Sequence, residues 1–152
     1  MPILKRVNKY QGLKDISVFR EESGLTSQFF NVYEFPESMV LVDCETTGGN
    51  ATRHRIIEIG LVVVERGSII DRWQSLVDPE TNLPSNITSL TGIAPKMLQG
   101  APKFADIAKK LMNLLVGRTF VAHNARFDYG FLKNEFDRTG HRFVANLGKK
   151  NE

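Results

Sequence analysis

The chain alternates between short apolar blocks and polar turns, which is typical of a sheet protein with connecting helices. The block at 39–42 is continuously apolar, so it predicts a strand that is buried on both faces. A polar turn at 65–68 separates two further apolar blocks and predicts an antiparallel hairpin. The strands expected from these patterns are 39–44, 56–64, 69–77 and 119–122.

The clearest helical pattern follows Pro102, which suits the first position of a helix. Apolar residues recur there at three- and four-residue steps as far as Leu115, and Gly117 is expected to end the helix. A short helix is expected over 87–90, with an N-cap at Ser85-Asn86.

A last helix is expected to begin at the capping residue Asn124 and to run to about Thr139. A hairpin, a helix and then a further strand indicate an α/β protein with a mixed sheet and flanking helices. The length of 152 residues is ordinary for one domain.

We expect that domain to occupy residues 38–143. Residues 1–37 are polar and mixed, and Gly24 interrupts them, so they predict an N-terminal arm with two short amphipathic helices. Residues 144–152 have no helical apolar face and predict an atypical tail.

Charge and composition narrow the class of partner only slightly. The net charge of +3 is compatible with a polyanionic partner, but 20 basic against 17 acidic residues is a small excess. The basic clusters 53–55 and 149–150 are therefore expected to be solvated surface. No apolar stretch is long enough to span a membrane, and no signal core follows the N-terminus, so we expect a cytoplasmic protein.

The strongest chemical feature is the pair Asp43 and Glu45 at the end of the first predicted strand. Residues two apart on a strand point to the same side, so this D-x-E places two carboxylates together. Asp128 follows another predicted strand and a polar turn. Three such acids suit a hard cation such as magnesium. Cys44 between the first two is expected to be a small buried packing residue.

Four blocks, in order along the chain, resemble the DEDD superfamily of 3′–5′ exonucleases. They are Asp-Cys-Glu-Thr-Thr-Gly at 43–48, Ile-Ile-Glu-Ile-Gly at 56–60, Leu-Thr-Gly-Ile at 90–93 and His-Asn-Ala-Arg-Phe-Asp at 123–128. The chain is most similar to the DEDDh branch that includes the proofreading (epsilon) subunit of bacterial DNA polymerase III and RNase T. The resemblance implies a ribonuclease H-like fold and hydrolysis of phosphodiesters from a 3′ end.

The resemblance also implies cofactors, partners and residue roles. Two divalent ions, Mg²⁺ or Mn²⁺, would be held by Asp43, Glu45 and Asp128, which are the expected catalytic residues. The substrate would be a single-stranded 3′ end of DNA or RNA, and a polymerase or a fused nuclease domain is the expected protein partner. The expected substrate-binding residues are Thr46, Thr47, Gly48, Leu90, Thr91, His123, Asn124 and Phe127.

Several of these residues could instead have a purely structural role. His123 either bonds only to the backbone or faces the substrate, and Phe127 either packs in the core or stacks on a base. His54 and His141 are expected to be exposed. Glu58 either supports the metal ligands from the adjacent strand or forms a surface salt bridge.

The sequence departs from the family at its end. The family has a fourth acid, preceded five residues earlier by a histidine, whereas the residue five beyond His141 is Asn146. We therefore expect the exonuclease-like domain to be incomplete and C-terminally truncated. The alternative is a catalytically impaired remnant that acts as a nucleic-acid or protein binding module, since a missing general base typically costs about 10²–10⁴ in rate.

Overall fold

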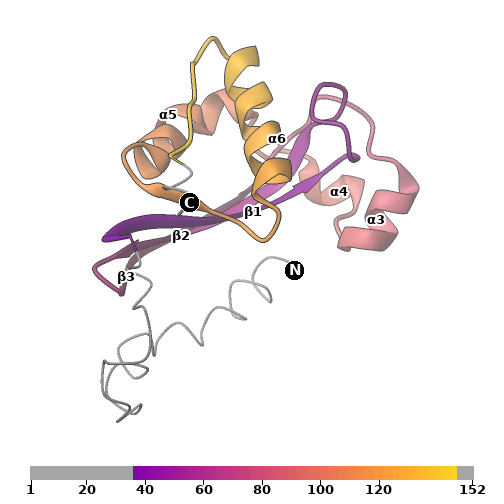
Figure 1. The fold of residues 1–152 in the computed structure, drawn as a ribbon. Helices are drawn as coiled ribbons and strands as arrows, with labels where there is room; N and C mark the ends of the chain where they lie inside the picture. Colours follow the sequence, from indigo (N-terminus) through magenta and orange to yellow (C-terminus); the bar gives the residue numbers. More distant parts are fainter. Residues whose placement is uncertain (1–35, 147–152) are drawn as a thin grey trace.

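The computed structural model describes residues 36–146, which form one mixed sheet with helices packed around it (Figure 1). The sheet has four strands in the order β3-β2-β1-β4. Strand β1 is antiparallel to β2 and parallel to β4, and β3 is antiparallel to β2. The predicted α/β class with a mixed sheet is confirmed. The strands are β1 (Ser38–Thr46), β2 (Ile56–Glu65), β3 (Ser68–Leu76) and β4 (Thr119–Val121).

The hairpin between β2 and β3 has the two-residue turn that its sequence favours. Arg66 and Gly67 both have positive φ angles, of 49° and 80°. Two successive positive φ values match the type I′ turn, whose twist suits antiparallel strands. The predicted turn at 65–68 is therefore confirmed, with Gly67 at a position where a side chain would be strained.

Four helices follow β3 in the described part of the chain, and the starts of two of them differ from the prediction. The predicted cap at Ser85-Asn86 is wrong, because the N-cap residue of the first helix is Pro84 and no side chain caps it. Pro102 is not the first helical residue either, because the next long helix begins at Phe104. The helices are α3 (Ser85–Thr91), α4 (Pro95–Leu98), α5 (Phe104–Leu115) and α6 (Ala125–Arg138).

The start of α5 has a local cause. The backbone N–H of Lys103 donates to the Asp106 carboxylate at 2.9 Å, and this contact sets the start of α5. Asn124 stands at the N-cap of α6 as expected, but its side chain makes no capping hydrogen bond. Helix α4 was not predicted, since four residues are too few for a periodic pattern.

The main core lies between the sheet and the pair α5 and α6, which cover the same face of the sheet (Figure 1). Alternate residues of β1 face these helices, as the two-residue period of a strand requires. Phe104 of α5 meets Phe136 of α6 edge to face, with ring centroids 5.0 Å apart. The β1 residues in this core are Val40, Val42 and Cys44.

The intervening residues of β1 lie on the opposite face. Met39 and Leu41 join an apolar cluster there, and Asp43 and Glu45 follow them toward the end of the strand. Their direct partners on β2 are Val64, Val62, Gly60 and Glu58, respectively. The D-x-E acids therefore share the sheet face that α5 and α6 do not cover.

Some predictions fall outside the described residues. The two helices expected within 1–37 lie outside them, except for residues 36 and 37, and so does the basic cluster 149–150. The start of the predicted tail is described: Phe120 of β4 donates its backbone N–H to the Asn146 carbonyl at 2.7 Å. Among residues 36–146, no helix has the length and apolar character needed to cross a membrane.

Candidate active site

The acids of the D-x-E motif lie at the end of β1, where β2 adds a third carboxylate. Glu45 stands directly opposite Glu58 on the antiparallel neighbour, so the two side chains project from the same face. Their exposed fractions are only 8% and 6%. Glu58 is thus not the surface residue that one of its predicted roles required.

Asp128 reaches this strand end from the first turn of α6. Its Oδ1 atom accepts the backbone N–H of Cys44 at 3.0 Å, and only 5% of the residue is exposed. Strand β4 pairs with β1 only as far as Leu41, so it does not extend to Cys44. A buried backbone N–H needs a partner, and the Asp128 carboxylate supplies it.

The electrostatics show that these acids are close neighbours. The pKa of Asp128 is raised to about 6, first by burial and then by the negative charge of Asp43, while the hydrogen bond from Cys44 opposes this rise. The pKa of the Cys44 thiol is also well above its ordinary value. Burial is the largest cause, and the charges of Asp128, Asp43 and Glu45 add to it. The thiol is therefore inert, and the predicted packing role of Cys44 is confirmed by its place in the core.

The donor chemistry at the strand end suits a divalent cation, because it consists of carboxylate oxygens held near one another. A cation there would relieve the repulsion that raises the Asp128 pKa. In the described range 36–146, however, no three His, Cys, Asp or Glu side chains are grouped closely enough to hold a metal ion. Asp43, Glu45 and Asp128 thus form a neighbourhood of acids, and their joint ligation of metal stays a prediction.

The predicted nucleotide-binding residues Thr46 and Thr47 both bond within the loop that follows β1. The Thr46 hydroxyl donates to the Gly48 carbonyl at 2.8 Å. Thr47 donates its backbone N–H to the Arg55 carbonyl at 2.8 Å and accepts the Arg55 N–H on its hydroxyl at 3.0 Å. These bonds close the loop between β1 and β2 at its base.

Gly48 is required in this loop because the imidazole of His54 lies against it. A methyl group added at Gly48 would stand 2.6–2.7 Å from three ring atoms of His54. The Nδ1 atom of the ring accepts the Asn50 backbone N–H at 3.0 Å, which fixes the ring in place. His54 is half-buried, so the prediction of an exposed side chain is wrong; exposed His141 fits that prediction.

The two residues predicted at the end of α3 have opposite environments. Leu90 is 77% exposed, which is unusual for a large apolar side chain and leaves it available to a ligand. Thr91 is buried, and its hydroxyl donates to the Ile87 carbonyl at 2.8 Å and accepts the Ile93 N–H at 3.1 Å. Thr91 thus shapes the end of α3 with both of its hydroxyl bonds.

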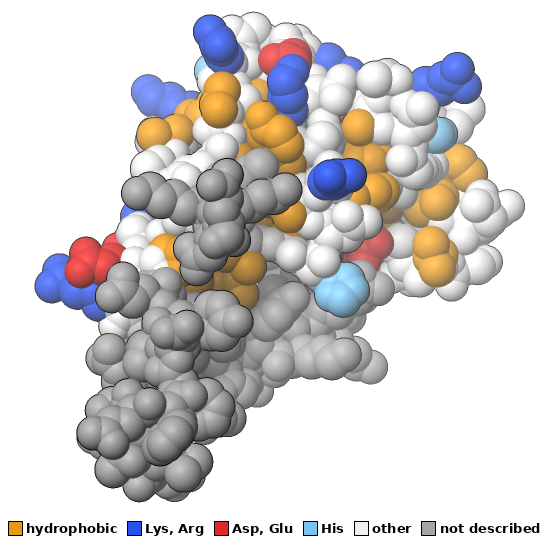
Figure 2. Space-filling model, viewed as in Figure 1, with side chains coloured by type: hydrophobic (Ala, Val, Ile, Leu, Met, Phe, Trp, Pro, Cys, Tyr) orange, Lys and Arg blue, Asp and Glu red, His pale blue; other side chains and the backbone are white. Residues whose placement is uncertain are grey.

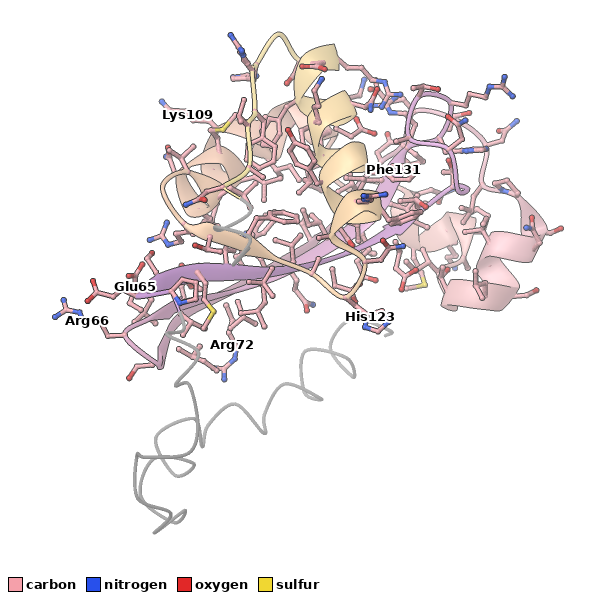
Figure 3. The ribbon with its side chains drawn as sticks, in the orientation of Figure 1. Glu65, Arg66, Arg72, Lys109, His123 and Phe131 are labelled. Carbon is pink, nitrogen blue, oxygen red and sulfur yellow. The ribbon has the colours of Figure 1, made fainter. Side chains whose placement is uncertain are left out.

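The β4–α6 turn carries the remaining predicted residues. His123 and Asn124 are exposed, and Figure 3 shows His123 projecting from this turn away from the helices. Phe127 is half-buried and packs against Phe131 with ring centroids 4.8 Å apart. The core alternative for Phe127 therefore has direct support, although the residue is only partly buried.

Two residues near the site escaped the sequence interpretation. Arg55, expected to be a solvated surface residue, is half-buried and makes a two-pronged ion pair with Glu135, which is 1% exposed. The sequence offered one sign of this role for Glu135. It lies seven residues after Asp128 and is therefore on the same side of the helix. Other basic side chains are scattered over the face that Figure 2 shows.

The sequence profile described as Exonuclease, RNase T, matches residues 40–150 of the chain. The chain belongs to the RNase T exonuclease family. This match covers the D-x-E strand, the α3 region and the β4–α6 turn, so the sites just described occupy the family's region of the sequence.

Relatives of this RNase T family domain are found within much longer proteins. The chain is 41% identical over 99 residues to a PolC-type DNA polymerase III from Clostridium perfringens, a match that covers 65% of the chain and 7% of that protein. It is 38% identical over 105 residues to the 3′-5′ exonuclease DinG of Bacillus subtilis, covering 68% of the chain and 11% of that protein. The chain thus spans only 7% to 11% of these two relatives.

Solved structures confirm the fold of the RNase T family domain. A product-bound exonuclease I superposes with a TM-score of 0.65 at 18% identity, over 71% of this chain and 27% of that one. A metal-free complex of Escherichia coli exonuclease I with single-stranded DNA gives 0.65 at 18% identity, over 70% and 25%. Likeness at this identity concerns the fold alone, and it confirms the predicted ribonuclease H-like architecture.

Proposed function

We propose that the chain is a 3′–5′ exonuclease domain that removes nucleotides from single-stranded 3′ ends of DNA or RNA. The observation that carries the proposal is the buried Asp128 carboxylate bound to the backbone at Cys44, beside Asp43. Keeping like charges together in a protein interior is costly, and such arrangements cluster at functional sites. The RNase T family match supplies the reaction class.

Asp43, Glu45 and Asp128 are the residues proposed to hold Mg²⁺ or Mn²⁺. Two bound ions would supply an activated water and stabilise the charge on the leaving oxygen. Asp128 Oδ1 accepts the Cys44 N–H, and this hydrogen bond fixes the orientation of the carboxylate. Its second oxygen would then be the one that binds an ion. Glu58, buried opposite Glu45, is placed to support that residue from β2.

The proposed substrate-binding residues lie at the ends of β1, α3 and β4 and in the first turn of α6. Leu90 offers an exposed apolar surface to a base, and His123 offers a ring donor on the β4–α6 turn. Thr46, Thr47 and Gly48 form the loop directly after the acids, and Thr91, Asn124 and Phe127 complete the predicted set. The structures of exonuclease I with single-stranded DNA support a single-stranded substrate.

The relatives also suggest a protein context. The matching region in PolC-type polymerases lies within a polymerase, and in DinG within a longer exonuclease, so a polymerase or a fused nuclease domain is the proposed partner. We further propose residues 38–143 as the catalytic domain, residues 1–37 as an appended arm and 144–152 as a separate tail. We also propose a cytoplasmic location, where a nucleic-acid substrate is available.

A labelled single-stranded oligonucleotide tests this function. We expect residues 1–152 with Mn²⁺ to shorten it slowly from its 3′ end, and Asp43→Asn to abolish the shortening. The rate should be low because no histidine stands five residues before an acid in residues 129–152, and a general base typically contributes about 10²–10⁴. Binding of the oligonucleotide without Asp43-dependent cleavage would favour the binding-module alternative.

A further inference from the structure

We infer that Glu135 is a positioning residue that sets the loop after the D-x-E motif relative to the acids, an inference that rests on the proposed function. Its side chain lies on α6, is 1% exposed and accepts two hydrogen bonds from one guanidinium. The Arg55 Nε donates to Oε1 at 2.8 Å and Nη2 donates to Oε2 at 3.0 Å. This two-pronged geometry fixes the orientation of both side chains.

Glu135 also contacts the backbone at the start of β2 and a second arginine. Its Oε1 accepts the Ile56 N–H at 3.2 Å and lies 3.3 Å from the Arg138 Nη1. A buried carboxylate is costly unless it is paired and hydrogen-bonded, and these contacts meet that requirement.

Both arginines hold the loop between β1 and β2. Arg55 is bound through its backbone to Thr47 at both its N–H and its carbonyl. Arg138 donates to the Ala51 carbonyl at 3.2 Å and to the Thr52 carbonyl at 3.1 Å. The loop is therefore fixed to α6 at its base through Arg55 and Glu135. Near its middle it is held directly by Arg138 of α6, whose guanidinium also lies beside Glu135.

The same helix carries Asp128, seven residues earlier. Asp128 attaches α6 to the end of β1, and Glu135 attaches it to the start of β2. Helix α6 therefore places a proposed catalytic acid and the proposed nucleotide loop as one unit. Thr46, Thr47 and Gly48 would shift relative to Asp128 if this second attachment were lost.

Stability alone does not account for this arrangement. Replacing a buried ion pair by apolar residues is often neutral or stabilising, so a buried Glu–Arg pair is weak evidence for a stabilising role. The Arg55–Glu135 pair instead fixes the orientation of the loop. A lysine at position 55 would not reproduce this, because its single ammonium group cannot make the two-pronged contact. A displacement of about 1 Å in a site of this kind can cost about 10² in rate.

Single-turnover cleavage with enzyme in excess separates positioning from simple destabilisation. Residues 1–152 carrying Glu135→Gln or Arg55→Lys are compared with the wild type on the same oligonucleotide with Mn²⁺. The matched control is Asp137→Asn, which removes an exposed ion pair with Lys133 on the same helix. The half-saturating enzyme concentration and the maximal cleavage rate are measured for each protein. Circular dichroism gives the folded fraction.

We expect Glu135→Gln and Arg55→Lys each to raise the half-saturating enzyme concentration by about tenfold, which is less than the about 10²-fold effect of misplacing a group in a site. The double variant should raise it little further, because both substitutions break the same contact. Because the enzyme is in excess, loss of folded protein alone would raise the half-saturating total concentration only in proportion to the folded fraction that is lost. Half-saturation is therefore expressed per folded enzyme, and an increase that disappears on this scale would overturn the inference. Unchanged half-saturation per folded enzyme in both variants, beside a wild type that shows Asp43-dependent cleavage, also overturns it, while the proposed function stands. A wild type that neither binds nor cleaves overturns the proposed function first.

Discussion

The Oδ1 atom of Asp128 accepts the backbone N–H of Cys44 at 3.0 Å, across 84 residues of sequence. This bond places an acid of α6 beside the middle residue of the D-x-E motif, at the point where β1 has passed the end of β4. One carboxylate therefore completes the hydrogen bonding of the sheet edge and brings a third acid to the proposed site. The predictions below follow from this arrangement and from the loop beside it.

The first prediction concerns pH in the absence of metal. The folded-state pKa of Asp128, about 6, lies above its ordinary value of 3.8, so the folded protein binds more protons between these pH values. Stability should then fall as pH rises through this window, by about 2–3 kcal/mol in total. Urea unfolding in EDTA between pH 3.5 and 7.5 measures it.

Asp128→Asn is the control for that measurement. The amide oxygen can still accept the Cys44 N–H, but the group no longer titrates. We expect the variant to lack this part of the pH dependence and to be the more stable protein at pH 7. Parallel pH profiles for the two proteins would contradict the raised pKa.

The second prediction concerns metal binding. Millimolar Mn²⁺ at pH 7 should raise the thermal unfolding midpoint, because a ligand that binds only the folded state stabilises it, by about 2.7 kcal/mol at a concentration 100 times the Kd. Asp43→Asn should remove most of this shift, since the charge of Asp43 is part of the acidic neighbourhood. An equal shift in both proteins would place the ion elsewhere.

The third prediction tests the contact between Gly48 and His54. Gly48→Ala should destabilise the protein by about 1–3 kcal/mol, the usual cost of forcing an extra carbon into a packed position. His54→Ala in the same chain should recover most of that loss because it removes the ring. A double-mutant cycle by urea unfolding gives the coupling, and additive effects would show that the ring does not lie against Gly48.

The fourth prediction separates substrate binding from stability at Leu90. Leu90→Ala should change the free energy of unfolding by less than about 0.5 kcal/mol, as expected for an exposed position, but should weaken oligonucleotide binding several-fold. Val116→Ala is the matched control, since Val116 is 60% exposed and belongs to none of the predicted sites. Fluorescence anisotropy with Ca²⁺ in place of Mn²⁺ measures affinity, and equal losses in both variants would remove Leu90 from the proposed substrate-binding residues.

Local patterns along the chain predicted the strands, the hairpin turn and the helices α5 and α6. These depend on local periodicity and turn chemistry, which residues close in sequence express. The same patterns also predicted that Asp43 and Glu45 share one face of β1, because that follows from the two-residue period of a strand. The four-residue helix α4 and the helix starts were beyond such patterns, since single backbone contacts decide them.

Contacts between residues far apart in the chain depend on how the elements pack. Asp128 binds Cys44 across 84 residues, and Arg55 binds Glu135 across 80. The sequence grouped Asp128 with Asp43 and Glu45 as expected metal ligands, but it gave no sign of the contact with Cys44. Arg55 before a strand and Glu135 on a helix are, in isolation, typical of a solvated surface. Packing α6 against the sheet buries both carboxylates, and burial then requires the partners that fix the loop and the acids beside each other.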